Sequence, residues 1–222
     1  AGYVHAVAGT CNSDGLLAPV GKHKILESYT KLYNTVKCGQ TAVAAALGLV
    51  REQKLDWRDI AALQIGLAER DARNQSRDPS YARPESRDTA NHSVRYCVAA
   101  ALVEGELGTD QFEAEKLRSP DILAVVDRSS VYWEKGHDLH WPAANPTTIR
   151  IRTSNGQETA KAMIAAPGHP DNPISDEVLE QKFRQLTRKA LSADQVSEVI
   201  GITHHLERLE DLRTLTAVLR RS

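Results

Sequence analysis

Cysteine is scarce in this chain of 222 residues, where Cys11, Cys38 and Cys97 stand far apart. An odd number of cysteines at such spacings does not make the disulfide framework on which small secreted domains depend. The first residues also lack the basic stretch followed by an apolar stretch that marks a secretory signal. Together these absences predict a protein of the reducing cytoplasm.

Charge of one sign and long hydrophobic runs are lacking as well. The 28 basic and 29 acidic residues give a formal net charge of −1, which argues against a general nucleic-acid-binding protein, because phosphate contacts need a surplus of Lys and Arg. The longest apolar run, residues 98–103, is far shorter than the roughly 20 residues that span a bilayer. Hydrophobic residues still make up 41% of the chain, enough for a real core, so disorder is excluded.

The common phosphate and nucleophile motifs are missing. The chain has neither a P-loop, nor a Gly-rich dinucleotide fingerprint between a strand and a helix, nor a nucleophile elbow. His137 and His140 form an HxxH pair without the helix and glutamate of a zinc protease, and the adjacent His204 and His205 would point about 100° apart on a helix. We therefore expect both pairs to be structural or solvent-facing, with no metal and no organic cofactor.

What is present is a pattern of buried helices and short strands. Apolar residues at helical spacing predict two buried helices, over 40–54 and 90–104, and an Asn-Gly pair at 155–156 predicts a hairpin. The segment 71–88, with almost no aliphatic side chains and two prolines, is predicted to be a polar surface loop or flap. The remaining expected elements are a short helix over 120–126, strands over 63–67, 131–133, 148–152 and 158–164, and C-terminal helices over 175–186, 192–206 and 209–219. Hairpins segregated from helices indicate an α+β fold.

One segment carries possible chemistry. Residues 28–41 place Lys31, Lys37, two tyrosines and several small polar groups directly before the first buried helix. A helix N-terminus offers free N–H donors and a partial positive charge, so a lysine beside it suits a carboxylate ligand. Composition alone also allows both lysines to be ordinary solvated surface residues, and the sequence leaves the two readings open.

These residues belong to a longer pattern. Lys31-Leu32-Tyr33 followed by Gln40-Thr41-Ala42 resembles the Lys-x-Tyr…Gln-x-Ala run of the MmgE/PrpD family, whose members include 2-methylcitrate dehydratase, cis-aconitate decarboxylase and iminodisuccinate epimerase. The resemblance continues through 89–105, which is similar to the family's A-x-x-S-x-x-Y helix, through Ser119-Pro120-Asp121 and the Asn-Gly hairpin, and through Gly168, Asn172-Pro173 and Lys182-Phe183. It covers roughly residues 25–219.

The resemblance implies a domain plan. Residues 25–170 would form a small mixed, lid-like α+β domain, and 171–222 would be helices that pack on an N-terminal helical domain. In the family that domain supplies an Asp and a His to catalysis; the irregular lead-in segment 1–24 does not replace it. We therefore expect the chain to work as the C-terminal half of an enzyme, with the helical domain as partner and a homodimer as the assembly.

The resemblance also implies chemistry. Family members act without metal or cofactor on small di- and tricarboxylates, by proton abstraction followed by elimination, decarboxylation or epimerisation. By resemblance, Lys31 is the expected catalytic residue, binding a carboxylate or moving a proton, and Tyr33 and Gln40 are expected substrate neighbours. His92 lies where some members carry histidine; it would either bind substrate or serve as a hydrogen-bonding residue at a helix start.

One position departs from the family. Many members have a histidine two residues before the glutamine, where this chain has Cys38, also expected in the substrate site. A thiol cannot carry the imidazolium charge. Either Cys38 alters the chemistry or part of the activity is lost. The sequence thus predicts a cofactor-independent lyase resembling 2-methylcitrate dehydratase, with a non-catalytic binding or assembly module as the alternative.

Overall fold

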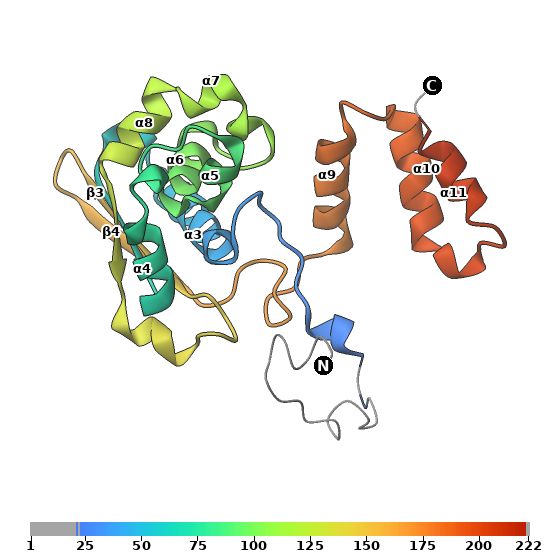
Figure 1. Ribbon diagram of the computed structural model, residues 1–222, viewed down its shortest axis with the longest axis horizontal. Helices are drawn as coiled ribbons and strands as arrows, with labels where there is room; N and C mark the ends of the chain where they lie inside the picture. The colour runs from blue at the N-terminus through green and yellow to red at the C-terminus, as the bar shows by residue number, and fades with distance from the viewer. Residues whose placement is uncertain (1–20, 22, 221–222) are drawn as a thin grey trace, which may run out of the picture.

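The computed structural model describes residue 21 and residues 23–220, so the lead-in segment predicted for 1–24 lies almost wholly outside the described residues. The described chain folds as α+β, with nine α-helices and one four-stranded sheet. A body of sheet and helices fills residues 37–163, and three C-terminal helices lie to one side of it (Figure 1). No helix of the described chain is long and apolar enough to cross a membrane.

The sheet is mixed, in the order β2-β1-β3-β4. Strand β1 (Ile60–Leu67) pairs in parallel with β2 (Ser129–Trp133), whereas β3 (Thr147–Thr153) runs antiparallel to β1 and to β4 (Glu158–Met163). All four strands were predicted. The Asn-Gly hairpin joins β3 to β4, and Gly156 takes the positive φ of 87° that the turn requires.

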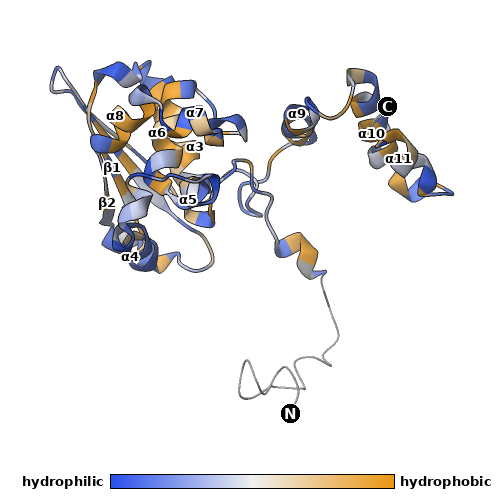
Figure 2. Ribbon diagram, turned by 45° about the horizontal axis from the view of Figure 1, so that its top comes forward, coloured by the Kyte–Doolittle hydropathy of each residue, from blue (hydrophilic) through white to orange (hydrophobic). Residues whose placement is uncertain are grey.

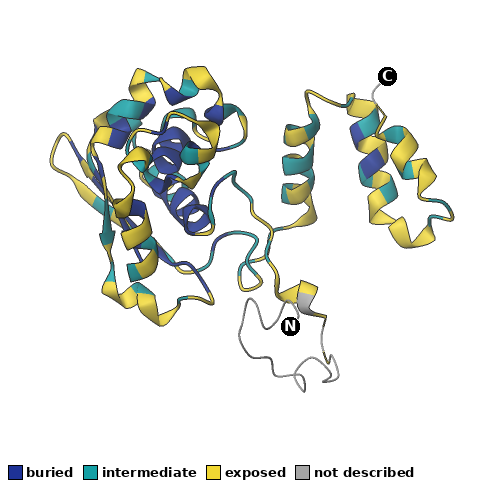
Figure 3. Ribbon diagram, in the orientation of Figure 1, coloured by how far each residue is buried: buried dark blue, intermediate teal, exposed yellow. Residues whose placement is uncertain are grey.

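Two buried helices cover the sheet. Helix α3 (Lys37–Gln53) packs on β3 and β4 and against α6 (Val94–Glu104), and α6 packs in turn against α8 (Pro120–Asp127). Alanines line both buried helices and allow this close approach, which Figure 3 shows as the dark core of the body. The hydrophobic cluster is drawn from residues 38–151 and excludes the C-terminal helices; Figure 2 shows the same concentration of apolar residues.

The predicted loop 71–88 is wrong for much of its length. Helix α4 (Glu69–Arg77) and the start of α5 (Arg87–His92) occupy it. Helix α4 buries only Ala72 and Gln75, so it has no apolar periodicity that the sequence could show. Acidic residues in its first turn suit the positive helix end. The helix predicted over 90–104 is divided, because the hydroxyl of Ser93 accepts from the Tyr96 N–H and starts α6.

The C-terminal helices were predicted close to their observed bounds. They are α9 (Asp176–Thr187), α10 (Ala193–His204) and α11 (Arg213–Val218). Ser175 caps α9, and Ser192 forms a full capping box with Gln195 at the start of α10. The short α7 (Ala114–Leu117), which no pattern predicted, lies before α8. Helix α9 stands beside the body, with α10 and α11 beyond it (Figure 1).

Candidate carboxylate-binding site

The loop before α3 is held from inside by Gln40. Its side-chain oxygen accepts from the Tyr33 N–H at 2.9 Å, and its amide nitrogen donates to the carbonyls of Tyr33 at 2.7 Å and Thr35 at 3.0 Å. Gln40 is 1% exposed; its bond to Thr35 is buried and its two bonds to Tyr33 are partly buried. The first turn of α3 thereby fixes the backbone of the segment that carries Lys31.

The same loop is tied to the end of α5. The Val36 N–H and the Thr35 hydroxyl both donate to the carbonyl of Asn91, at 3.2 and 3.0 Å. A Cβ on Gly39 would lie 2.3 Å from the Thr35 hydroxyl, so this close packing needs glycine. Gln75 of α4 locks the α5–α6 junction by donating to the His92 carbonyl at 2.9 Å and accepting from the Val94 N–H at 2.8 Å.

The turn at residue 168, which follows β4, also reaches the loop. The Thr30 N–H donates to the Gly168 carbonyl at 3.0 Å. Gly168 has φ +92°, and a Cβ there would lie 2.1 Å from the Thr30 oxygen. The segment that leads to Lys31 and the turn at Gly168 are separate parts of the family pattern along the chain. In the structure they are in direct contact.

A pocket of about 330 Å³ opens over this loop. Helix α9 forms one wall, and the end of α5 and the loop around residue 108 form the others. Its lining consists of Lys31, Leu32, Tyr33, Asn34, Thr35, Val36, Asn91, His92, Gly108, Thr109, Lys182, Gln185 and Leu186. Among the described residues, no aspartate or glutamate lines it, so its charged groups are cationic.

Two lysines meet at this pocket. The Lys31 ammonium donates to the Thr35 carbonyl at 3.1 Å, and the Lys182 ammonium donates to the carbonyl of Lys31 itself. In the described part of the chain, no carboxylate lies within ion-pair distance of either ammonium. Burial, and then the positive charge of Lys31, lower the pKa of Lys182.

A second hollow of about 590 Å³ lies on the other side of Val36 and His92. Lys37, Cys38, Asp71, Asn74, Gln75, Arg77, Asp78, Pro79 and Tyr81 complete its lining, so charges of both signs face it. The Cys38 thiol is 6% exposed, and burial raises its pKa far above the ordinary value. At neutral pH it is therefore a neutral thiol and not a nucleophilic thiolate.

The structure brings some of the predicted site residues together and separates others. Lys31 and Tyr33 line the smaller pocket, Cys38 lines the larger one and His92 lines both. Gln40 lines neither, since its amide is turned to the loop backbone. His92 was expected at a helix start but is the last residue of α5, where its Nδ1 lies 2.8 Å from the Asp88 carbonyl.

Sequence reasoning did not place Lys182, Gln185 and Asn91 in the pocket. Lys182 is part of the family pattern, but no signal in the sequence indicates that α9 contacts the loop at Lys31, 151 residues away. The histidine pairs lie elsewhere: His137 contacts the Thr148 hydroxyl at 3.0 Å, and His204 pairs with Glu180 at 2.8 Å. Within the described ranges, no three His, Cys, Asp or Glu side chains are grouped to hold a metal ion.

Known proteins are similar to this chain in sequence. The MmgE/PrpD C-terminal domain matches residues 33–208 of the chain. The cis-aconitate decarboxylases of Mus musculus and Homo sapiens are each 28% identical over 144 residues. A cis-aconitate decarboxylase-like protein of Aspergillus oryzae is 24% identical over 137 residues. Each match covers 62% of this chain and 28% of the relative. The chain therefore belongs to the MmgE/PrpD family, and it contains the family's C-terminal domain.

Proposed function

We propose that the pocket over residues 31–35 binds a small di- or tricarboxylate, and that the chain contributes it to a cofactor-independent lyase resembling 2-methylcitrate dehydratase. The observation that carries this proposal is a pocket with two lysines and no acidic lining residue. An ammonium with no carboxylate partner attracts an anion strongly in a partly desolvated site. The relatives are named for cis-aconitate, a tricarboxylate.

Lys31 is the proposed catalytic residue. Its ammonium has three donors, of which one goes to the Thr35 carbonyl. The other two can hold a substrate carboxylate, and a cation there stabilises the negative charge that develops when the neighbouring carbon loses its proton. We propose Tyr33 and His92 as substrate contacts, because both line the pocket. Gln40 is proposed to act on substrate only through the loop that it holds.

We propose the N-terminal helical domain as the partner that completes the reaction. The C-terminal helices leave apolar side chains exposed, among them Leu186 at 51% and Leu212 at 64%. A shallow apolar hollow between α9 and α10, lined by Leu179, Phe183, Val199 and Ile200, adds to this surface. Exposed apolar faces of this kind are typical of contact surfaces. Assembly into a homodimer is proposed for the complete enzyme.

The alternative is a non-catalytic binding module, and Cys38 favours it. This residue stands where many family members have histidine, and its buried thiol stays protonated. Such a group neither buffers a proton near pH 7 nor carries a positive charge. A site with this change can retain the ability to bind carboxylates while it loses turnover.

Isothermal titration calorimetry with tricarballylate, a non-reacting tricarboxylate, tests the binding proposal. We expect the chain to bind it and Lys31→Ala to weaken binding at least tenfold. Lys135→Ala is the matched control, because Lys135 is an exposed lysine that does not line the pocket. Undiminished binding by Lys31→Ala would remove Lys31 from the site. Proton NMR of 2-methylcitrate and cis-aconitate, incubated with the chain and the helical domain, then separates turnover from binding alone.

A further inference from the structure

Lys182 reaches the pocket from helix α9, which lies outside the body of residues 37–163. It lies in the middle of α9, which Ser175 caps and which has no buried residue of its own. Its ammonium nevertheless contacts the backbone of Lys31. Since hydrophobic burial does not hold α9 against the body, polar contacts must set the position of this lysine.

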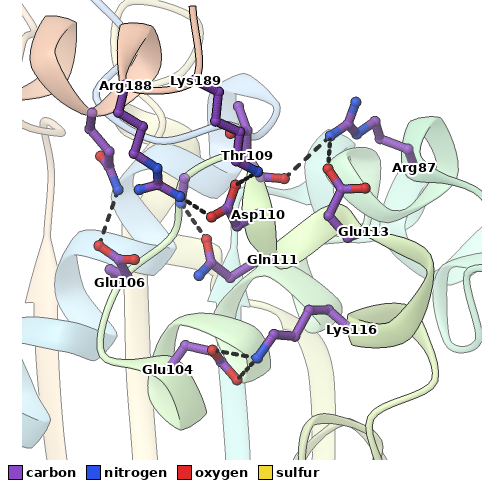
Figure 4. Close-up of polar contacts among 12 residues, drawn as sticks. Arg87, Glu104, Glu106, Thr109, Asp110, Gln111, Glu113, Lys116, Arg188 and Lys189 are labelled. Carbon is purple, nitrogen blue, oxygen red and sulfur yellow. Dashed lines mark hydrogen bonds and ion pairs between the residues drawn. The ribbon is translucent and has the colours of Figure 1, made fainter. Parts of the chain in front are cut away.

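Such contacts are found toward the end of α9 (Figure 4). Arg188 and Lys189, which follow the helix, both pair with Asp110, and Gln185 donates to Glu106 at 3.1 Å. Figure 4 shows Arg188 and Lys189 reaching Asp110 in the loop after α6. With the contact between Lys182 and Lys31, they fix α9 at two places, and Lys182 is held over the pocket.

The two ammonium groups have spare donors and unbalanced charge. Each has three N–H donors, and each gives one to a backbone carbonyl, so two on each lysine are free for a ligand. A monocarboxylate neutralises only one of these charges. A ligand with two carboxylates neutralises both, and it also relieves the repulsion between them.

We propose that Lys182 is the second carboxylate anchor of the pocket and makes it selective for dianionic over monoanionic acids. This inference rests on the proposed function, in which Lys31 binds the first carboxylate. It adds the residue that determines specificity and assigns α9 to the substrate site. The pocket volume of about 330 Å³ suits a small acid of this kind.

Calorimetry with glutarate and butyrate, a dicarboxylate and a monocarboxylate of similar length, tests the inference. We expect the full chain to prefer glutarate, and Lys182→Gln to weaken glutarate binding about tenfold, while butyrate changes less than about twofold. Lys182→Arg should restore the preference, because it returns the charge. Lys135→Gln, a lysine-to-glutamine change at an exposed position outside the pocket and away from α9, should leave both affinities unchanged.

Movement of α9 is the competing explanation, and Asp110→Asn examines it. That change removes the carboxylate that pairs with Arg188 and Lys189 but keeps the ammonium of Lys182 and its contact with the Lys31 carbonyl, so we expect it to weaken glutarate binding much less than Lys182→Gln does. Equal losses for glutarate and butyrate in Lys182→Gln, or an equal loss of glutarate binding in Asp110→Asn, would overturn the inference. If the unaltered chain binds neither tricarballylate nor glutarate, the proposed function fails. If glutarate binding depends on Lys31 and not on Lys182, only this inference fails.

Discussion

At the scale of single residues, the geometry of the pocket depends on Gln40. Its amide makes three hydrogen bonds to the backbone of Tyr33 and Thr35. Gln40→Ala would leave the Tyr33 N–H without a partner, while the two carbonyls would keep only their bonds from the Thr35 N–H and the Lys31 ammonium, so we expect a loss of about 2 kcal/mol in the free energy of unfolding. Urea denaturation measures this loss, and calorimetry should show weaker tricarballylate binding as the loop loosens.

Gln53→Ala is the matched control, because Gln53 ends the same helix with an exposed side chain. It should change stability by less than about 0.5 kcal/mol. An effect of Gln40→Ala no larger than that of Gln53→Ala would show that the loop does not depend on these bonds.

The buried thiols predict a loss of stability at alkaline pH. Burial raises the pKa of Cys38 far above its ordinary value and that of Cys97 to about 12. A group whose pKa is higher in the folded chain stabilises the fold below its unfolded pKa, near 9, and that contribution is lost as pH rises toward the folded pKa. At pH 10 each thiol should cost about 1.4 kcal/mol.

Urea denaturation at pH 8 and pH 10 tests this dependence. Cys97→Ala should reduce the drop in the free energy of unfolding between pH 8 and pH 10 by the part that the Cys97 thiol contributes. This holds whatever the substitution does to stability at pH 8. An unchanged difference in this variant would mean that the thiol titrates alike in the folded and unfolded chain.

The resemblance singled out the loop before α3 but could not give the direction of each side chain. Lys31 and Tyr33 line the smaller pocket. Gln40, only three residues into α3, is turned inward because its amide matches the three backbone groups of the loop. Cys38 faces the larger hollow. Spacing along a loop does not encode which side chains bend back to satisfy the backbone, so sequence alone could not separate these roles.

At the scale of elements, two glycines with positive φ differ in what surrounds them. Gly168 has φ +92°, and its Cβ position lies 2.1 Å from the Thr30 oxygen, whereas Gly156 has φ +87° and no atom within 4 Å. Gly156→Ala should therefore cost only the backbone strain, about 1 kcal/mol. Gly168→Ala adds a backbone clash and should cost about 3 kcal/mol or more.

Thermal and urea denaturation of the two variants check the comparison. We also expect Gly168→Ala to weaken tricarballylate binding, because the turn at 168 is bonded to the segment that leads to Lys31. Equal costs for the two variants would show that the turn moves freely away from Thr30.

The sequence predicted the secondary structure least well in polar segments. The sequence predicts a loop where α4 forms, because this helix buries only Ala72 and Gln75 among charged residues. What stabilises it is tertiary: Gln75 bonds to the α5–α6 junction, and Asp71 accepts from Asn145 at 2.8 Å. The strands and buried helices, in contrast, bury apolar residues along their length, and periodicity predicted them.

The contacts of α9 with Asp110 predict a local change without a global one. Exposed ion pairs contribute little to stability, so Asp110→Asn should lower the free energy of unfolding by less than about 1 kcal/mol. It should nevertheless free the end of α9, and hydrogen exchange in residues 176–187 should become several times faster.

Glu113→Gln is the control, because Glu113 pairs with Arg87 within the body (Figure 4). It should leave exchange in α9 unchanged. If Asp110→Asn also leaves it unchanged, these ion pairs do not hold the helix.

At the scale of the whole molecule, the core and the C-terminal helices differ in how they are held. The hydrophobic cluster is built from residues 38–151. Helices α9 and α11 bury no residue, and α10 buries only Val196 and Val199. The sequence predicted these helices from their caps and apolar faces, but it could not show that α9 is attached to the body by polar contacts, since the partners lie about 80 residues away.

This division predicts two levels of stability in one chain. Native-state hydrogen exchange in low urea should give α9–α11 opening free energies at least about 2 kcal/mol below those of α3 and α6. A single value shared by all these helices would show that the molecule unfolds as one unit.

Because Lys182 and Gln185 line the pocket, tricarballylate at about 100 times its Kd should raise the opening free energy of α9 by up to about 2.7 kcal/mol. It should protect α10 and α11 much less, because neither helix lines the pocket. If tricarballylate does not slow hydrogen exchange in α9, this helix is not part of the binding site.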